Sequence, residues 1–532
     1  MFMFIFLLML FSVAILLLSL LIFSFLFSVL RKSFIIFVNN HNSAYCKDYG
    51  PISYPIIGCL MSFYENRRRL LDWYTDLVSC SPTSTIVVQR LGALRTVVTA
   101  NPTNVEYIVK TNFANFPKGK PFTEILGDLL GCGIFNVDGE LWSTQRKLAS
   151  HEFSARSLRE FVVKTLEEEV RGRLIPLLEN AAENGTVLDL QEVLKRFAFD
   201  TICKVSLGHD PCCLDMSRPA PSLFWAFDSA AAISAKRSTE PVALLWKMKR
   251  LFRVGSEKKL REAIGIVRRS VSEIIKNKRK TLEDDKATAA GGARGDMLSR
   301  FLMAGHEEEV VRDMVISFIM AGRDTTSAAM TWLFWLLSQN PEAEKLLLNE
   351  VSRYNDHSND ISGGLNYDAL QEMSFLKACL CETMRLYPPV SWDSKHAAND
   401  DVLPDGTVVR RGDRVTFFPY GMGRIEELWG KDCLEFKPDR WLDEPSGGEI
   451  NGHVLKAVSP FKFPVFQAGP RVCLGKEMAF TQMKYVVASV LNRFEIRPVC
   501  LDRPLFVPLL TAHMAGGLRI SVTKRGVGSH NN

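Results

Sequence analysis

Near its C-terminus the chain reads Phe466-Gln467-Ala468-Gly469-Pro470-Arg471-Val472-Cys473-Leu474-Gly475, and helical periodicity follows directly over residues 476–494. Cys473 therefore precedes a predicted helix, where unpaired backbone N–H groups and the helix dipole favour a thiolate. A lone cysteine is most often a small buried hydrophobic residue. The residue types around this one favour a different interpretation, a thiolate that binds a metal.

Four neighbours of Cys473 suit a flat, negatively charged cofactor. Gly469 and Gly475 carry no side chain, so such a cofactor could approach the backbone closely at both positions. Arg471 offers a forked donor for a carboxylate such as a haem propionate, and Phe466 would cover the sulfur and exclude water. A cysteine thiolate as axial ligand pushes electron density onto haem iron and favours O–O bond cleavage. The sequence therefore predicts a haem-thiolate site with Cys473 as the metal ligand.

The spacing Phe-x-x-Gly-x-Arg-x-Cys-x-Gly resembles the haem-ligand signature of the cytochrome P-450 monooxygenases at every fixed position. Three further signatures occur in that family's order, so the resemblance extends from Tyr54 to Val522. It implies a mainly α fold with a minor β region, arranged as a triangular prism, and haem b as the cofactor. It also implies electrons from NADPH, delivered by NADPH–cytochrome P-450 reductase. Candidate contacts for the acidic surface of that reductase are Lys147, Lys462 and Lys476.

The second signature is Ala321-Gly322-Arg323-Asp324-Thr325-Thr326, inside a long predicted helix at 307–339. Glycine and adjacent threonines are poor residues for a helix interior, and a threonine hydroxyl can bond to the preceding turn. We therefore expect a local widening or kink there. An acid beside an alcohol can relay protons during dioxygen activation, and the resemblance gives this catalytic role to Asp324 and Thr325. Two threonines packed in a buried helix are the alternative.

The third signature, Glu382-Thr383-Met384-Arg385, places an acid and a base on one helix face. A Glu-x-x-Arg pair by itself is usually a surface ion pair. The later segment Phe436-Lys437-Pro438-Asp439-Arg440-Trp441 resembles the family segment whose arginine joins this pair. The resemblance therefore implies that Glu382, Arg385 and Arg440 form a buried network with a structural role rather than a catalytic one.

The fourth signature is Trp142-Ser143-Thr144-Gln145-Arg146, which matches the family's propionate-binding helix. Trp142 and Arg146 are four residues apart and therefore face the same way on a helix. His396 occupies the place where many relatives carry another propionate-binding residue. For His396, a hydrogen-bonded core histidine is the alternative.

Five further passages narrow the resemblance to the plant fatty-acid ω-hydroxylase group: residues 126–139, 393–397, 420–424, 463–469 and 510–517. The C-terminal third most resembles the branch that hydroxylates jasmonoyl-isoleucine at its chain end, the jasmonoyl-isoleucine 12-hydroxylases of jasmonate catabolism. Apolar residues suit a long aliphatic guest, and the candidate substrate contacts are Phe122, Phe135, Val390 and Trp392. The implied reaction is terminal hydroxylation of a lipid-like small molecule. Jasmonoyl-isoleucine is the first candidate, and a medium- or long-chain fatty acid or a sterol side chain is the alternative.

A non-oxygenase of the same fold, which rearranges a hydroperoxide without an external electron donor, is the nearest alternative of another class. Relatives of that kind typically lose the acid–alcohol pair and alter the cysteine loop. Asp324, Thr325 and the intact loop therefore favour an oxygenase. A haem-binding sensor or carrier would need no proton relay at all.

Residues 1–30 contain no charged side chain and are numerous enough to span a bilayer as one helix. Arg31 and Lys32 follow at once, and no small-residue cleavage motif follows the apolar run, so we expect an uncleaved anchor rather than a signal peptide. The positive-inside rule then places the catalytic body in the cytosol. The expected location is the endoplasmic reticulum membrane. Three parts are expected: a transmembrane anchor (1–30), a linker containing proline and glycine (31–58) and a haem-binding monooxygenase domain (59–532).

Composition excludes two classes of protein. With 65 Lys and Arg against 59 Asp and Glu, the net charge of +6 is too small to indicate a nucleic-acid partner. Twelve cysteines in 532 residues are too sparse for a disulfide scaffold.

Periodicity predicts helices at 141–180, 257–280, 307–339, 341–354, 368–387 and 476–494, strands at 84–89, 94–99 and 415–418, and exposed loops at 281–295, 355–364 and 443–452. We therefore expect one mainly helical body with a minor sheet.

Overall fold

The computed structural model describes residues 17–21, 23–24, 27, 50–54, 56–154, 156–240, 243–287, 296–356, 365–443 and 454–526. The chain divides into two compact units, Met1–Gly50 and Pro51–Asn532, and the second of them is the body described below. Within the described ranges, no helix combines the length and the apolar character needed to cross a membrane. Most of the expected anchor and the start of the expected linker lie outside the described residues, as do 288–295, 357–364 and 444–452 of the expected loops.

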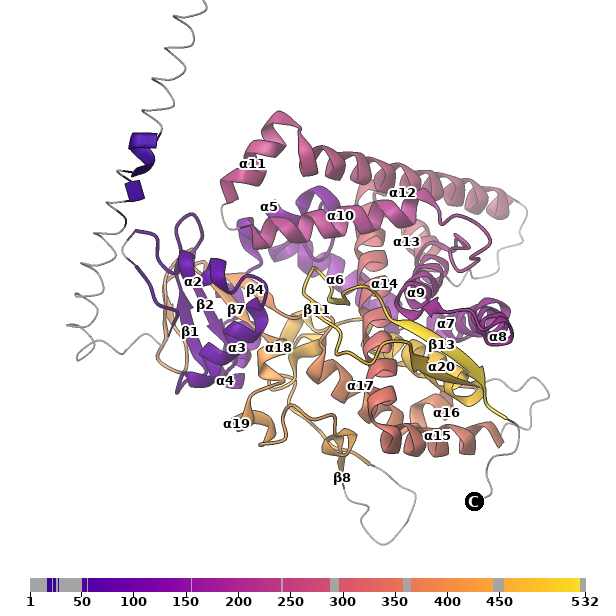
Figure 1. Ribbon diagram of the computed structural model, residues 1–532. Coiled ribbons are helices and arrows are strands. Elements are labelled where there is room, and N and C mark those ends of the chain that lie inside the picture. The colour runs from indigo at the N-terminus through magenta and orange to yellow at the C-terminus, as the bar shows by residue number, and fades with distance from the viewer. Residues whose placement is uncertain are drawn as a thin grey trace, which may run out of the picture. The chain divides into compact units, whose positions relative to one another are not determined.

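The body is mainly helical, as the sequence predicts (Figure 1). Its described helices are α2 (Leu60–Glu65), α3 (Leu70–Cys80), α4 (Pro102–Glu106), α5 (Gly119–Leu130), α6 (Gly139–Ser154), α7 (Arg156–Glu169), α8 (Ile175–Asn184), α9 (Leu190–Leu207), α10 (Ser222–Thr239), α11 (Ala243–Phe252), α12 (Gly255–Ala287), α13 (Met297–Met303), α14 (Glu308–Gln339), α15 (Pro341–Asp356), α16 (Tyr367–Glu372), α17 (Ser374–Leu386), α18 (Pro419–Met422), α19 (Glu426–Trp429) and α20 (Lys476–Arg493). The expected loop at 281–295 begins later than predicted, because α12 continues to Ala287.

The minor β region consists of several small sheets. The largest has four strands in the order β1-β2-β7-β4, in which β2 and β7 are parallel and the other two pairs are antiparallel. A second sheet has the order β10-β13-β3, and the remaining described strands form two-stranded pairs. The bounds are β1 (Thr85–Val88), β2 (Thr96–Thr99), β3 (Leu188–Asp189), β4 (Asp393–His396), β5 (Asp401–Val402), β6 (Val408–Val409), β7 (Arg414–Phe417), β8 (Leu442–Asp443), β9 (Val454–Leu455), β10 (Phe494–Pro498), β11 (Phe506–Val507), β12 (His513–Met514) and β13 (Arg519–Lys524).

Helix α14 runs through the helical part of the body and packs against α9, α12, α17 and α20 (Figure 1). Most of its residues from Val311 to Leu337 are buried, because most of the sequence there is apolar or small. Trp332 stacks on Tyr387 with ring centroids 3.9 Å apart, which joins α14 to the end of α17. The helix that carries Asp324 and Thr325 is therefore held rigidly from several directions.

The predicted helix at 141–180 is divided in the structure. Helix α6 ends at Ser154 and α7 begins at Arg156, and a single π-helical turn at Val170–Leu174 separates α7 from α8. Pro176 stands in the first turn of α8, where the missing N–H of proline removes no hydrogen bond of that helix. Periodicity extends across such breaks because each new helix keeps its apolar face toward the same core.

The predicted helix at 368–387 is also divided, at Met373. The buried carboxylate of Glu350 in α15 accepts hydrogen bonds from the backbone N–H groups of Phe375 and Leu376, both at 2.8 Å. These N–H groups begin α17 and would otherwise be unsatisfied. A distant side chain therefore starts the second helix.

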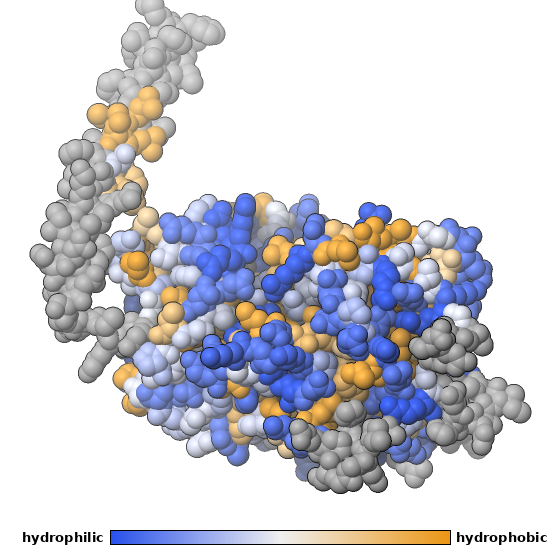
Figure 2. All heavy atoms as spheres, turned by 60° about the horizontal axis from the view of Figure 1, so that its bottom comes forward, coloured by the Kyte–Doolittle hydropathy of each residue, from blue (hydrophilic) through white to orange (hydrophobic). Residues whose placement is uncertain are grey.

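The first residues of the body come from the segment that the sequence places in the linker. Gly58 forms β-bridges with Tyr54 and with Arg90, next to β1. A Cβ at Gly58 would lie 2.2 Å from the Gln89 carbonyl oxygen, and the φ of Gly58 is +58°, so glycine is required there. On the face that Figure 2 presents, hydrophilic residues cover most of the surface and hydrophobic ones form separate smaller groups.

Candidate active site

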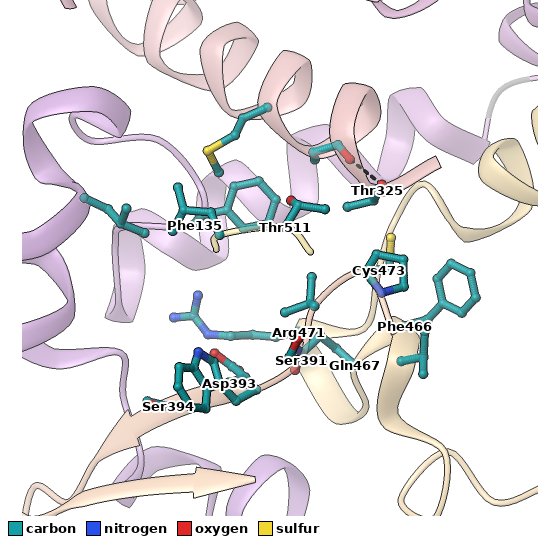
Figure 3. Close-up of a pocket in the computed structure, with 18 of the residues that line it drawn as sticks. Phe135, Thr325, Ser391, Asp393, Ser394, Phe466, Gln467, Arg471, Cys473 and Thr511 are labelled. Carbon is teal, nitrogen blue, oxygen red and sulfur yellow. Dashed lines mark hydrogen bonds between the residues drawn. The ribbon is translucent and has the colours of Figure 1, made fainter. Parts of the chain in front are cut away.

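A cavity of about 450 Å³ lies between α5, α6, α14, the four-stranded sheet and the loop before α20. Its lining is largely apolar and includes all four candidate substrate contacts, Phe122, Phe135, Val390 and Trp392. Figure 3 shows Phe135, Thr325 and Thr511 on one side of this space, and Arg471, Asp393 and Ser391 on the other. Of the residues that the sequence singles out for catalysis or cofactor binding, the structure gathers Trp142, Arg146, Thr325, His396, Phe466, Arg471 and Cys473 around this cavity.

Cys473 lies in the loop before α20, and its side chain faces the cavity (Figure 3). Its backbone N–H donates to the Phe466 carbonyl oxygen at 2.8 Å, which closes the loop. Its side chain is exposed to the cavity, but desolvation by the surrounding protein is the largest influence on the thiol and raises the pKa of Cys473 above its ordinary value. The Gly475 N–H and the charges of Arg146 and Lys476 act in the opposite direction. The expected local preference for a thiolate is therefore present but smaller than the effect of burial, and coordination by a metal would complete the deprotonation.

The two glycines of the loop differ in what a side chain would meet at their positions. Gly469 has a φ of +65°, and a Cβ there would lie 2.1 Å from the Val109 carbonyl oxygen. Its requirement is thus a close backbone contact, which corrects the expectation that it makes room for a cofactor. At Gly475 the nearest atom to an added Cβ is a ring carbon of Phe153 at 3.8 Å, so this position does leave free space beside Cys473. Gln467, which also lines the cavity, has a φ of +60°, a strained conformation for a residue other than glycine.

Arg471 is held between a carboxylate and an aromatic ring. Its Nη2 donates to Asp138 Oδ1 at 2.7 Å and to the Val137 carbonyl oxygen at 2.9 Å. Its guanidinium lies 4.5 Å from the centre of the Trp142 ring. Arg146, by contrast, lines the cavity with no carboxylate within ion-pair distance among the described residues. Arg146 therefore offers an uncompensated positive charge to an anion in the cavity.

His396 is buried, and its two ring nitrogens differ. Nδ1 lies 2.5 Å from the Lys118 carbonyl oxygen and must donate, while Nε2 is buried and has no hydrogen-bond partner in the described structure. Burial lowers the pKa of His396 to about 4, so the imidazole is neutral near pH 7. A carboxylate at Nε2 would raise this pKa, because only the imidazolium donates from both nitrogens.

The cavity wall also holds three charged residues that the sequence did not single out. Lys118 and Lys395 both donate to the buried carboxylate of Asp393, at 2.5 and 2.7 Å. Burial raises the pKa of Asp393, but the two lysines together have the larger effect and lower it. The net pKa lies below the ordinary value, so the carboxyl is ionised. The run Asp393–His396 forms strand β4, which the sequence did not predict because it contains no apolar alternation. Neighbouring Asp and Lys residues in such a run are a weak signal of a buried strand, since these residue types are usually exposed.

These residues fit a haem. Cys473 would supply the thiolate ligand, and Gly475 leaves free space beside it. The uncompensated Arg146, the unpartnered His396 Nε2 and the forked guanidinium of Arg471 would hold the propionate carboxylates. Phe466 packs against Phe480 with ring centroids 5.1 Å apart and lines the same cavity as Cys473.

Thr325 and Asp324 are placed differently, although they are adjacent. Thr325 lines the cavity, and its Oγ1 donates to the Ala321 carbonyl oxygen at 2.6 Å (Figure 3). The Asp324 carboxylate instead accepts from the buried Arg323, at 2.7 and 3.1 Å. Arg323 also pairs with Asp228. Asp324 is therefore held by an arginine and does not contribute to the described cavity lining.

The expected widening of this helix is absent. Helix α14 is one uninterrupted α-helix from Glu308 to Gln339. Thr325, Thr326, Ser327 and Thr331 all bond back to the carbonyl oxygen four residues earlier, at 2.6–2.9 Å. These hydroxyl bonds add to the backbone ladder, and the packing around α14 keeps the helix regular.

Glu382, Arg385 and Arg440 come together away from the cavity. Arg385 donates to both oxygens of Glu382 at 2.7 Å, and neither side chain has any exposed surface. Arg440 lies 3.4 Å from Glu382 Oε1. Trp441 Nε1 and the Lys437 backbone N–H also donate to the same carboxylate, both at 2.9 Å. The geometry is that of a fully satisfied buried ion pair.

Comparison with known proteins agrees with this geometry. The family model described as Cytochrome P450 matches residues 49–510. The chain is 66% identical to "Cytochrome P450 94B1" of Arabidopsis thaliana over 89% of this chain and 91% of that protein. It is 62% identical to "Cytochrome P450 94B3" of the same plant over 95% and 98%, and 44% identical to "Cytochrome P450 94A1" of Vicia sativa over 89% and 90%.

Among solved structures, the fold matches a "cytochrome P450DA heme domain" with a TM-score of 0.72 at 20% identity, over 90% of this chain and 97% of that chain. At that identity the likeness concerns the fold alone. The family match and the identities to the plant proteins go further, because both cover most of the chain. The chain therefore belongs to the cytochrome P450 family, and the protein is a haem-dependent monooxygenase.

Proposed function

We propose that the protein hydroxylates the terminal carbon of a fatty acid or fatty-acid-derived substrate, with jasmonoyl-isoleucine 12-hydroxylation as the most specific form of the reaction. The observation that carries this proposal is the cavity, whose largely apolar wall extends from Cys473 to Phe122, Phe135 and Trp392. The five sequence passages that resemble the ω-hydroxylases support it, as does the high identity to the two Arabidopsis relatives.

Positioning is the main chemical demand of terminal hydroxylation. The C–H bond of a terminal methyl is stronger than that of the neighbouring methylene, so intrinsic reactivity favours in-chain oxidation. An enzyme reverses this preference by holding the end carbon at the reacting centre and the inner carbons away from it. Phe122, Phe135 and Trp392 are bulky enough to confine an aliphatic chain in this cavity.

When bound, haem would supply the iron at which dioxygen is activated for insertion into a C–H bond. Cys473 would hold that iron through its thiolate, and Arg146, Arg471 and His396 would hold the carboxylates. Thr325 Oγ1 donates its hydrogen to the Ala321 carbonyl oxygen. Its lone pairs can therefore accept a hydrogen bond from a donor on the cavity side. We propose Asp324 as the acid that feeds this hydroxyl. Such a role requires its carboxylate to exchange Arg323 for a proton source during turnover.

Product analysis tests the reaction. Reconstituted with reductase, the enzyme is expected to convert jasmonoyl-isoleucine mainly to its terminal alcohol, with medium-chain fatty acids as the next best substrates. Mass spectrometry of the products from jasmonoyl-isoleucine, a series of fatty acids and a sterol identifies both the substrate class and the oxidised carbon. In-chain hydroxylation or epoxidation as the dominant outcome in all three classes would overturn the proposal without affecting the family assignment.

Thr325→Ala is expected to uncouple the enzyme. Loss of a positioned proton-transfer group costs about 100-fold in the assisted step. Product formation should fall on that scale, while NADPH consumption continues and appears as hydrogen peroxide. The ratio of product to NADPH measures this directly. Thr331→Ala is the matched control, because Thr331 makes the same bond to its preceding turn but does not line the cavity. An unchanged ratio in Thr325→Ala would refute the assignment.

We propose that electrons reach the enzyme from NADPH through membrane-bound NADPH–cytochrome P-450 reductase. Lys147 and Lys476 have exposed side chains, and Lys462 is partly exposed over the Trp429 ring at 4.4 Å. These three lysines are the candidate contacts for an acidic partner surface.

The uncharged run at 1–30 supports an endoplasmic reticulum anchor with a cytosolic body. Protease treatment of sealed microsomes tests this topology, since a protected body would contradict it.

A further inference from the structure

One face of the four-stranded sheet forms part of the cavity wall. The register pairs Thr96 with Arg414, Val98 with Thr416, Ser394 with Thr416 and His396 with Arg414. Residues opposite one another in a sheet share a face, and all of these residues line the cavity. Arg414 therefore stands in the middle of this face, and Arg90, just beyond the end of β1, lines the same cavity.

The two arginines are partly buried and have no counter-charge. No carboxylate forms an ion pair with either guanidinium among the residues that the structure describes. Arg90 Nη1 and Arg414 Nε are buried without any hydrogen-bond partner in those residues. The Arg90 guanidinium lies 3.8 Å from the centre of the Phe63 ring. The charge of Arg90 lowers the pKa of Arg414 after the larger effect of burial, so the two groups are near enough to repel each other.

Each of the other cationic side chains that line the cavity has a counter-ion or an assigned ligand. Lys118 and Lys395 share Asp393, and Arg471 pairs with Asp138. Arg146 and His396 are assigned above to the haem. Arg90 and Arg414 remain as two uncompensated guanidinium groups in a mostly apolar wall, an arrangement that costs stability unless an anion joins it.

We propose that Arg90 and Arg414 bind the carboxylate of the substrate and thereby position its opposite end toward Cys473. This inference rests on the proposed function and names the head-group site for it. A guanidinium pair presents two planar forks that match a carboxylate. An acid whose carboxylate is held at the sheet must direct its aliphatic end elsewhere in the cavity, and the remaining wall is largely apolar. Haem propionates are carboxylates too, and Arg414 is the cross-strand neighbour of His396, so the experiment must separate the two sources.

The experiment uses the holoenzyme and two pairs of ligands: jasmonoyl-isoleucine with its methyl ester, and dodecanoic acid with its methyl ester. Arg90→Gln and Arg414→Gln are compared with Arg414→Lys, which keeps the charge, and with Arg410→Gln as the control. Arg410 is exposed and lies four residues before Arg414 without lining the cavity. The readouts are the dissociation constant from the substrate-induced spectral shift, the haem content per protein and the Tm of the ligand-free enzyme.

Each Gln variant is expected to weaken binding of the accepted acid by about 10- to 100-fold, the range for hydrogen bonds to a charged group, and to leave the ester unchanged. Arg414→Lys should recover part of the loss. Haem content and Tm should not fall, because each substitution removes an uncompensated buried charge. Equal losses for acid and ester, or loss of haem with unchanged acid binding by the haem-loaded fraction, would overturn the inference. Failure of the unmodified enzyme to bind or hydroxylate either acid would instead overturn the proposed function.

Discussion

Cys473→Ala is expected to abolish hydroxylation and to remove the thiolate-type Soret band of the reduced, carbon-monoxide-bound protein. A thiolate ligand would push electron density onto the iron and favour O–O cleavage, and alanine cannot replace it. Among the described residues that line the cavity, Cys473 is the one cysteine, and it lies beside the free space at Gly475. Activity of the variant should lie below detection. Difference spectroscopy of the reduced protein, together with product assays, checks both parts.

The matched control is Cys500→Ala, because Cys500 is exposed and lies outside the cavity. Its spectrum and activity should equal those of the unmodified enzyme. A thiolate-type band that survives in Cys473→Ala would remove the basis for the whole site assignment.

Glu382→Gln is expected to produce a large loss of stability. The Glu382 carboxylate is fully buried and accepts from Arg385, Trp441 and the Lys437 backbone. Removing its charge leaves the buried Arg385 without a counter-ion, which costs roughly 3–5 kcal/mol. For a domain of this size such a loss lowers Tm by about 3–5 °C. Thermal unfolding followed by circular dichroism, with haem retention as a second signal, measures it.

Glu435→Gln provides the comparison for that variant. Glu435 pairs with Lys437 at 3.0 Å, but its side chain is 63% exposed. Exposed ion pairs contribute about 0–1 kcal/mol, so Tm should barely move. Equal Tm shifts in the two variants would show that the Glu382 network contributes no more than a surface pair.

The polar side of the cavity was the part that sequence patterns could not predict. Strand β4 carries Asp393, Lys395 and His396 and therefore lacks the apolar alternation of an ordinary strand. It is buried because Lys118, from the start of α5, shares the Asp393 carboxylate with Lys395. Buried charges are tolerated only when paired, and the partner lies 275 residues away along the chain.

Sequence patterns also could not predict where the Asp324 side chain lies. Adjacent residues on a helix point in directions about 100° apart, so Asp324 and Thr325 cannot face one cavity equally. The buried Arg323, which also pairs with Asp228 of α10, holds the Asp324 carboxylate. The sequence shows an acid beside an alcohol, but only the packing of α10 against α14 decides which of them faces the cavity.

The sequence by itself determined the features whose physics is local. The cysteine loop before α20, the Glu382–Arg385 pair at a spacing of three, and the long apolar helix α14 all depend on neighbours within a few residues. Tertiary structure alone decided the division of α16 from α17 by Glu350, the burial of β4, and the meeting of Arg90 with Arg414 on one cavity wall. These features depend on side chains that are hundreds of residues apart or on different elements, and burial makes their pairing, or its absence, energetically decisive.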